Sequence, residues 1–166
     1  MNYISAEEFL KQPNEIQKVL INWWNDNLSE GFLYTYNSYK TCLMIFKQNE
    51  NMNNVQGGII PIFQLYQLIQ FIEEKTKGKL EISFHYGSYR IWSHELDNNF
   101  ICTGKYYFFD KLGKNLLQAL WQVACKIAQE EADNQKQNII STNKQGLPVI
   151  KGGGKTMREM YNEEYR

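Results

Sequence analysis

Apolar residues recur along the first part of the chain at helical spacing. Ser5 and Glu8 stand three residues apart as a capping box, and the short helix that they open is predicted to stop before Pro13. Asn14 is then predicted to cap a second helix. The apolar positions that follow the i, i+3, i+4, i+7, i+8 rule in this second helix are Ile16, Val19, Leu20, Trp23 and Trp24.

Two later segments show the same period. Pro61 suits the first turn of a helix that would end near Gly78. Asn115 is predicted to cap the strongest helix of the chain, which would run to about Glu131. The apolar stripe of the first segment is Phe63, Leu65, Leu68, Ile69 and Ile72, and that of the second is Leu116, Leu117, Leu120, Trp121, Ala124, Ile127 and Ala128.

Between the helices the pattern changes to that of strands. Apolar and polar residues alternate in LEISFHYGSYRIWSHE, residues 80–95, which is the clearest hairpin. Two further runs rich in aromatic residues, 32–47 and 99–109, predict hairpins that turn at Asn37-Ser38 and at Thr103-Gly104.

Hairpins separated by helices indicate the α+β class. We predict an antiparallel sheet of hairpins with helices packed on one face, since alternating strands need only one buried side. These elements form a single domain over residues 1–132. Residues 133–166 are mostly polar, and we predict a flexible or docking C-terminal extension with a short terminal helix.

Charge and composition narrow the class of partner. The 166 residues carry 18 basic and 18 acidic side chains, so the chain lacks the positive charge of a phosphate-backbone binder, and extended nucleic-acid binding is disfavoured. Cys42, Cys102 and Cys125 form an odd set without ligand spacing, which indicates reduced thiols. Neither a signal peptide nor an apolar window of about 18 residues is present. We therefore expect a cytoplasmic protein with no membrane partner.

The glycine-rich stretch VIKGGGKTMREMY, residues 149–161, resembles a phosphate-binding loop only in part. A P-loop that ends at Lys155 and Thr156 needs a glycine at position 149, which is Val149. Backbone N–H groups could still form a simpler anion-binding nest there; the residues of that nest are Gly152, Gly153, Gly154, Lys155 and Thr156. The alternative is a hinge that lets a terminal helix dock on the body or on another subunit.

The side chains that could hold a metal or act as a base are dispersed. A turn centred on Gly87 would place His85 opposite Tyr89 and His94 opposite Leu80, at opposite ends of the hairpin. The two histidines then cannot share a metal in one subunit, and the cysteines lie in apolar runs without a base beside them. We predict no metal, no cofactor and no enzymatic activity.

Aromatic residues with polar ends gather in the predicted strands. Tyr86, Tyr89 and Trp92, with Arg90 between them, give the hairpin a surface that could anchor a protein or stack on a nucleotide base. Ordinary sheet packing favours the same residue types. Protein contact ranks ahead of nucleic acid because the net charge is zero.

Three stretches resemble uncharacterised small proteins of phages and prophages of Gram-positive, clostridial-type bacteria. They are ISAEEFLKQPNEIQKVLINWW at 4–24, FIEEKTKG at 71–78 and LLQALWQVACKIAQEE at 116–131. The resemblance covers residues 1–132 in outline and is carried by helix caps and core positions, so it transfers no catalytic residue. It implies a phage accessory gene acting in the cytoplasm of an infected or lysogenic host.

Three functions remain open on these observations. The first is a non-enzymatic binding protein that inhibits a host defence system by occupying a host protein. The second is a sponge that sequesters a small nucleotide signal through the aromatic hairpin or the glycine nest. The third, and least favoured, is a P-loop-like nucleotide enzyme. A homo-oligomer is compatible with each, because the apolar islands of the extension need cover.

Overall fold

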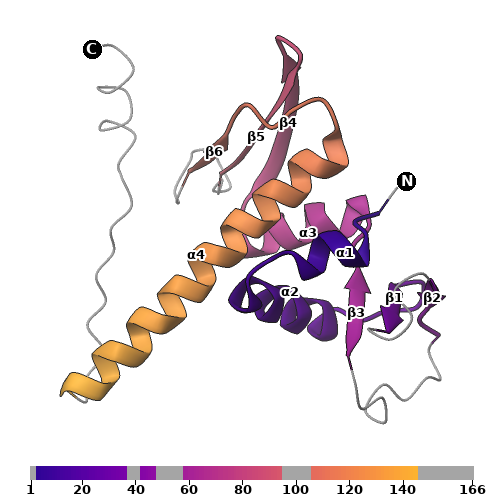
Figure 1. Cartoon of the computed structure of the whole chain (residues 1–166). Coiled ribbons are helices and arrows are strands. Elements are labelled where there is room, and N and C mark those ends of the chain that lie inside the picture. The colour runs from indigo at the N-terminus through magenta and orange to yellow at the C-terminus, as the bar shows by residue number, and fades with distance from the viewer. Residues whose placement is uncertain (1–2, 37–41, 48–57, 95–105, 146–166) are drawn as a thin grey trace, which may run out of the picture.

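The computed structural model describes residues 3–36, 42–47, 58–94 and 106–145, which form four helices and six strands (Figure 1). The helices are α1 (Ala6–Leu10), α2 (Asn14–Asp26), α3 (Leu65–Thr76) and α4 (Leu116–Gln145). The strands are β1 (Leu33–Tyr36), β2 (Met44–Ile45), β3 (Ile59–Ile62), β4 (Lys79–His85), β5 (Ser88–His94) and β6 (Tyr107–Phe109). The predicted α+β class with antiparallel pairing is confirmed.

The strands divide into two three-stranded sheets instead of one. The first has the order β2-β1-β3 and the second the order β4-β5-β6. In the first sheet Leu33 pairs with Ile45 and Tyr34 with Met44. The turn predicted at Asn37-Ser38 falls within residues 37–41, which lie outside the described part of the chain.

Pro61 lies in strand β3 and not at the start of a helix, so this part of the prediction is wrong. Pro61 is buried in β3 and pairs with Tyr34 of β1. Proline has no N–H to donate, but β3 is an edge strand of its sheet, where a missing outward donor costs nothing. The helix begins only at Leu65, and the Gln67 side chain accepts a hydrogen bond from the Gln64 backbone N–H.

The apolar faces of the helices were predicted correctly, whereas some of the predicted helix ends differ from the observed ones. The Ser5 hydroxyl accepts from the Glu8 N–H at 3.2 Å, and the Asn115 side chain accepts from the Gln118 N–H at 3.2 Å, as predicted. Pro13, not Asn14, is the N-cap of α2. Helix α4 continues past the predicted end near Glu131 to Gln145, since no glycine or proline interrupts that stretch.

The β4–β5 hairpin exists, with a register one residue away from the predicted one. His85 pairs with Ser88 and His94 with Lys79, so the turn contains two residues, Tyr86 and Gly87. Both have positive φ, 49° and 80°. This is the turn type whose twist matches that of paired strands, which explains its preference over a longer turn centred on Gly87.

One aromatic cluster joins the helices to the first sheet. Phe63 follows β3 directly and is completely buried. Its ring lies 6.2 Å from that of Phe9 in α1, 6.3 Å from Trp23 in α2 and 6.0 Å from Trp121 in α4. Helix α4 also packs on α3 and β5, so it connects this cluster to the second sheet.

Replacing Phe63 with alanine is expected to lower the free energy of unfolding by about 3–5 kcal/mol, because it opens a cavity between three helices. Urea unfolding followed by circular dichroism measures this change. Phe63→Leu should cost less, and Gln122→Ala, on the exposed side of α4, should change the free energy by at most about 0.5 kcal/mol. Equal effects of the three substitutions would contradict the central position of Phe63.

Candidate functional site

The β4–β5 hairpin rises away from the helices, and its tip is free of them (Figure 1). Tyr86 occupies the turn, and its side chain is fully exposed, at 101%. Gly87, the second turn residue, has the positive φ that a side chain disfavours. Two paired seven-residue strands therefore hold an aromatic ring at a fixed position in solvent.

Alternation places the residues chosen from the sequence on different faces of this hairpin. Tyr89 shares a face with Phe84, which lies directly opposite, and their rings are 4.9 Å apart. Arg90 and Trp92 lie on the other face. The expected grouping of Tyr89, Arg90 and Trp92 at one site is therefore wrong, because neighbours along a strand point to opposite sides.

The face that carries Phe84 changes from buried on β5 to exposed on β4. Ile91 of β5 is completely buried where α4 crosses the sheet. Ile82, which pairs directly with Ile91, is exposed on β4, and Phe84 is 51% exposed. An apolar strip therefore continues beyond the part that the helix covers.

The opposite face carries a second aromatic group, which the sequence did not reveal. Phe108 of β6 lies beside Trp92 of β5 and is 44% exposed. Its ring is nearly parallel to that of Tyr106, at 6.5 Å and 8°, and Tyr106 stacks on His94. The Trp92 indole N–H donates to Glu81 at 2.9 Å. Only the pairing of β5 with β6 brings these residues together, and no local sequence motif predicts that pairing.

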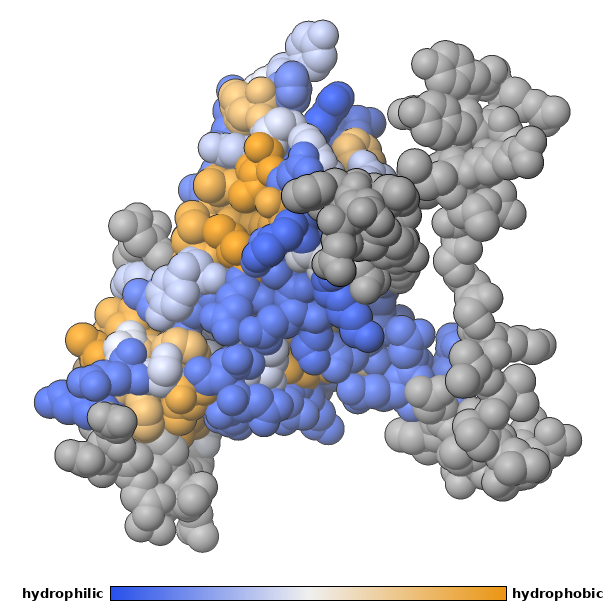
Figure 2. All heavy atoms as spheres, turned by 180° about the vertical axis from the view of Figure 1, so that it is seen from behind, coloured by the Kyte–Doolittle hydropathy of each residue, from blue (hydrophilic) through white to orange (hydrophobic). Residues whose placement is uncertain are grey.

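Apolar surface gathers in two separate areas. Figure 2 shows one in the upper part of the molecule, where the hairpin rises, and one at the lower left, where β1 and β2 lie. The exposed side chains of the second area include Leu43, Ile45 and Tyr66. Tyr66 of α3 packs edge-on against the buried Phe32 at 6.4 Å, so this area is continuous with the core.

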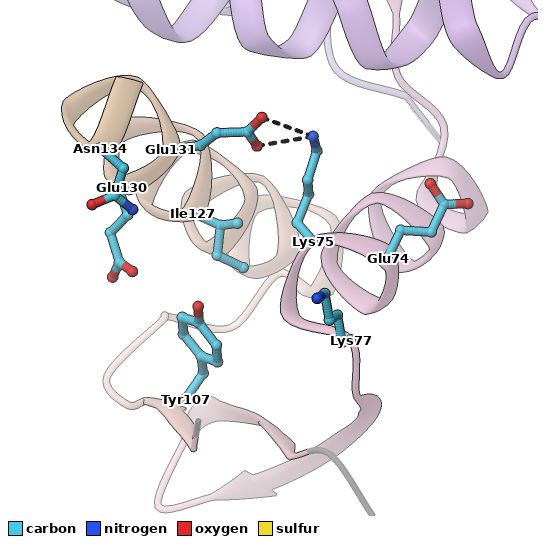
Figure 3. A pocket seen from close by; sticks show the side chains of 8 residues that line it. All are labelled: Glu74, Lys75, Lys77, Tyr107, Ile127, Glu130, Glu131 and Asn134. Carbon is cyan, nitrogen blue, oxygen red and sulfur yellow. Dashed lines mark hydrogen bonds and ion pairs between the residues drawn. The ribbon is translucent and has the colours of Figure 1, made fainter. Parts of the chain in front are cut away.

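A cleft of about 310 Å³ lies between α3, α4 and β6 (Figure 3). Lys75 spans its upper side and contacts both carboxylate oxygens of Glu131 at 2.9 Å. Tyr107 stands up from β6 toward α4, and Lys77 reaches in from the end of α3. The lining residues are Glu74, Lys75, Lys77, Tyr107, Ile127, Glu130, Glu131 and Asn134.

The cleft is poorly suited to catalysis or to anions. The residues that line it include three carboxylates and two ammonium groups, and the Lys75 ammonium is already paired with Glu131, which disfavours a phosphate. The Glu74 side chain turns away and accepts hydrogen bonds from the side chains of Trp23 and Gln70. Neither a histidine nor a cysteine is among these lining residues, so an acid–base pair with a nucleophile is not assembled there.

The other candidates from the sequence are dispersed. His85 and His94 lie at opposite ends of the hairpin, as expected even with the changed register. Within the described residues, no group of three or more histidine, cysteine, aspartate or glutamate side chains is arranged to hold a metal ion. Residues Gly152, Gly153, Gly154, Lys155 and Thr156 lie outside the part that the structure describes.

Comparisons with known proteins add no relative. No protein-family model, no curated protein and no solved structure matched the chain. None of the helices in the described ranges is long and apolar enough to cross a membrane.

Burial raises the pKa of the Cys125 thiol to about 12, with a smaller contribution from the Glu8 carboxylate. At pH 8 the thiolate fraction is then on the order of 10⁻⁴, and only the thiolate attacks disulfides. We expect a Cys42→Ser/Cys102→Ser protein, in which Cys125 alone remains, to react with an aromatic disulfide reagent only after unfolding in urea. The Cys125→Ser protein, which keeps the exposed Cys42, should react on mixing. Rapid labelling of native Cys125 would contradict its burial.

Proposed function

We propose that this protein is a non-enzymatic binding protein whose contact surface is the β4–β5 hairpin. The observation that carries the proposal is the exposed aromatic and apolar set on a rigid, projecting element. Tyr86 stands at the tip, Ile82 and Phe84 lie on one face, and Phe108 lies on the other. Because the paired strands are already ordered, little conformational entropy is lost when a partner buries these side chains. This low cost favours tight binding.

A protein fits this surface better than a nucleic acid does. Interface centres are rich in aromatic residues and poor in charge, with charged groups around them. The hairpin meets that description, since Lys79, Glu81 and Arg90 carry charges of both signs beside the aromatic groups. A phosphate backbone would need a large excess of positive charge, whereas the hairpin carries a net charge of only +1 from Lys79, Arg90 and Glu81, and the whole chain carries none.

The resemblance to phage and prophage proteins supplies the class of target. On this proposal the chain is phage-encoded, acts in the cytoplasm of the infected host and occupies a host defence protein. Occupancy alone is sufficient for inhibition, so the proposal requires no catalytic residue. Blocking a functional surface of the target requires contact area and a fixed shape, and the hairpin provides both.

A small nucleotide signal is the second candidate ligand. The parallel rings of Tyr106 and Phe108 beside Trp92 resemble a platform on which a base can stack. Arg90 lies on the same face as Trp92 and could meet a phosphate. The acidic lining of the cleft opposes such a ligand there, so a nucleotide would bind on the open face of the hairpin.

Replacing Tyr86 with asparagine is expected to reduce anti-defence activity at least about tenfold, because removal of one central aromatic side chain costs an interface roughly 2 kcal/mol. Asparagine tolerates the positive φ of this position, so the turn is retained. The measurement is the plaque count of a defence-sensitive phage on cells that carry a defence system and express the protein.

The matched control is Tyr66→Asn, which removes an exposed ring from the other apolar area. It should leave the plaque count unchanged. Wild-type protein that rescues no phage across a panel of defence systems would overturn the inhibitor proposal. Equal loss in both variants would place the contact surface elsewhere.

A panel of mononucleotides, dinucleotides and cyclic nucleotides separates the two ligands. On the protein-binding proposal, no nucleotide changes the melting temperature. A sponge would gain about 2.7 kcal/mol at a hundredfold excess of ligand over its dissociation constant. A shift that is present in the wild type and lost in Phe108→Ser would replace the protein target with a nucleotide.

A further inference from the structure

Among the described strands, β4 lies at the edge of its sheet, and no described strand pairs with its outward side. The second sheet has the order β4-β5-β6, so β4 pairs with β5 on one side only. The other edge of β5 is covered, because β6 pairs with it and Tyr89 exchanges backbone hydrogen bonds with Leu112 and Gly113. Within the described ranges no residue takes the equivalent place beside Ile82 and Phe84 of β4.

The direction of the open backbone groups follows from the register. The two-residue turn makes His85 and Ser88 a hydrogen-bonded pair, so every second residue of β4 directs its N–H and C=O away from β5. Leu80 confirms this alternation, since its N–H donates outward to the Glu73 carboxylate at 3.0 Å. Ile82 and Phe84 therefore direct both backbone groups into the space beside the sheet.

Glu73 and the turn mark the two ends of this open edge. At Leu80 the edge is occupied by the Glu73 side chain, and beyond His85 the chain turns back. The open window is therefore residues 81–85, with Ser83 at its centre. It contains no proline, no bulge and no lysine, the devices by which edge strands normally avoid pairing.

We propose that two copies of this chain pair through β4, antiparallel and centred on Ser83, to form a continuous six-stranded sheet. In this register Ile82 of each copy faces Phe84 of the other. Each outward N–H and C=O of these two residues then has a partner, which satisfies the groups that the single chain leaves open. Their side chains also extend the apolar strip from one copy to the next.

The other face of the window is complementary to itself in the same register. Glu81 of each copy lies opposite His85 of the other, so an acidic group meets an imidazole. Ser83 meets Ser83 of the second copy at the symmetry axis. The Ser83 hydroxyl oxygen is buried and has no hydrogen-bond partner among the described residues, and a facing hydroxyl is a suitable partner.

The neighbouring register fits less well. Centring the pair on Ile82 would direct Phe84 toward Leu80, whose N–H is already bonded to Glu73. It would also set Lys79 opposite His85 and leave the Ser83 hydroxyls apart. A two-fold axis at Ser83 is the arrangement in which the same patch serves both copies without these losses.

Two experiments on the full chain test this proposal. Light scattering measures the mass in solution, and introduced cysteines test the register by cross-linking. Light scattering across a dilution series should show a concentration-dependent change from one chain to two, that is, from 19.7 kDa to twice that mass. Ile82→Pro removes only an outward N–H, so it should weaken dimerisation about tenfold or more by deleting two symmetry-related hydrogen bonds. Ile82→Val, which keeps the N–H, is the matched control.

Disulfide formation tests the register independently of proline. In the Cys42→Ser/Cys102→Ser background, Ser83→Cys should cross-link with itself, because facing residues of a non-hydrogen-bonded pair are about 4.5 Å apart at Cα. Glu81→Cys alone should not, because its twin lies roughly 13 Å away. Glu81→Cys mixed with His85→Cys should cross-link.

Three outcomes would overturn the proposal. The first is a single-chain mass at every concentration with no preference for Ser83→Cys. The second is a dimer that Ile82→Pro leaves intact, since another surface then holds it. The third is cross-linking of Glu81→Cys with Ser83→Cys in place of His85→Cys, which would identify the Ile82-centred register. All of these are read on purified protein, so they do not depend on the proposed host target.

Discussion

The two-residue turn at Tyr86 and Gly87 is the constraint on which the projecting surface depends. It sets the register of β4 against β5, and in a strand a shift by one residue moves every side chain to the other face. With this register Ile82, Phe84 and Tyr89 share the face that α4 partly covers. The same register determines which backbone groups of β4 point outward. The turn therefore determines both the apolar side-chain surface of the hairpin and the open backbone edge of β4.

The base of the hairpin is fixed by contacts that the tip does not share. Ile91 packs under α4, and Ser93 forms a buried hydrogen bond with Thr76 at the end of α3. Gly78 lies between α3 and β4 and packs closely against the backbone of His94. A Cβ atom added at Gly78 would lie 2.6 Å from the backbone atoms of His94. These contacts hold the hairpin at a defined angle, so its tip is displayed without cover from the helices.

The sequence predicted what depends on neighbours along the chain. The caps at Ser5 and Asn115 and the apolar faces of the helices depend on spacing within one element. Both caps were found as expected, and the predicted apolar residues lie in the core or packed against it. The existence of the 80–95 hairpin followed from alternation for the same reason. Its register did not, because a Gly at the second turn position and a Gly at the centre of a longer turn give similar local patterns.

Features that depend on pairing between distant segments were missed. Pro61 favours a helix start when read locally, and only its place on the edge of the first sheet makes a strand possible. Phe108 becomes part of a surface because β6 lies beside Trp92. Glu73 gives no sign in the sequence that it takes the Leu80 N–H and so limits the open edge. In each case the deciding partner is on another element.

Pairing through β4 would also change what the hairpin surface offers to a target. A single hairpin presents a narrow strip of apolar side chains, whereas two hairpins joined at Ser83 would present Ile82 and Phe84 from both copies on one continuous face. Helix α4 covers only the β5 side of each sheet, so the middle of the joined face stays open. The edge that needs a partner and the face that could hold one are built from the same residues. Self-association would therefore enlarge the binding surface without blocking it.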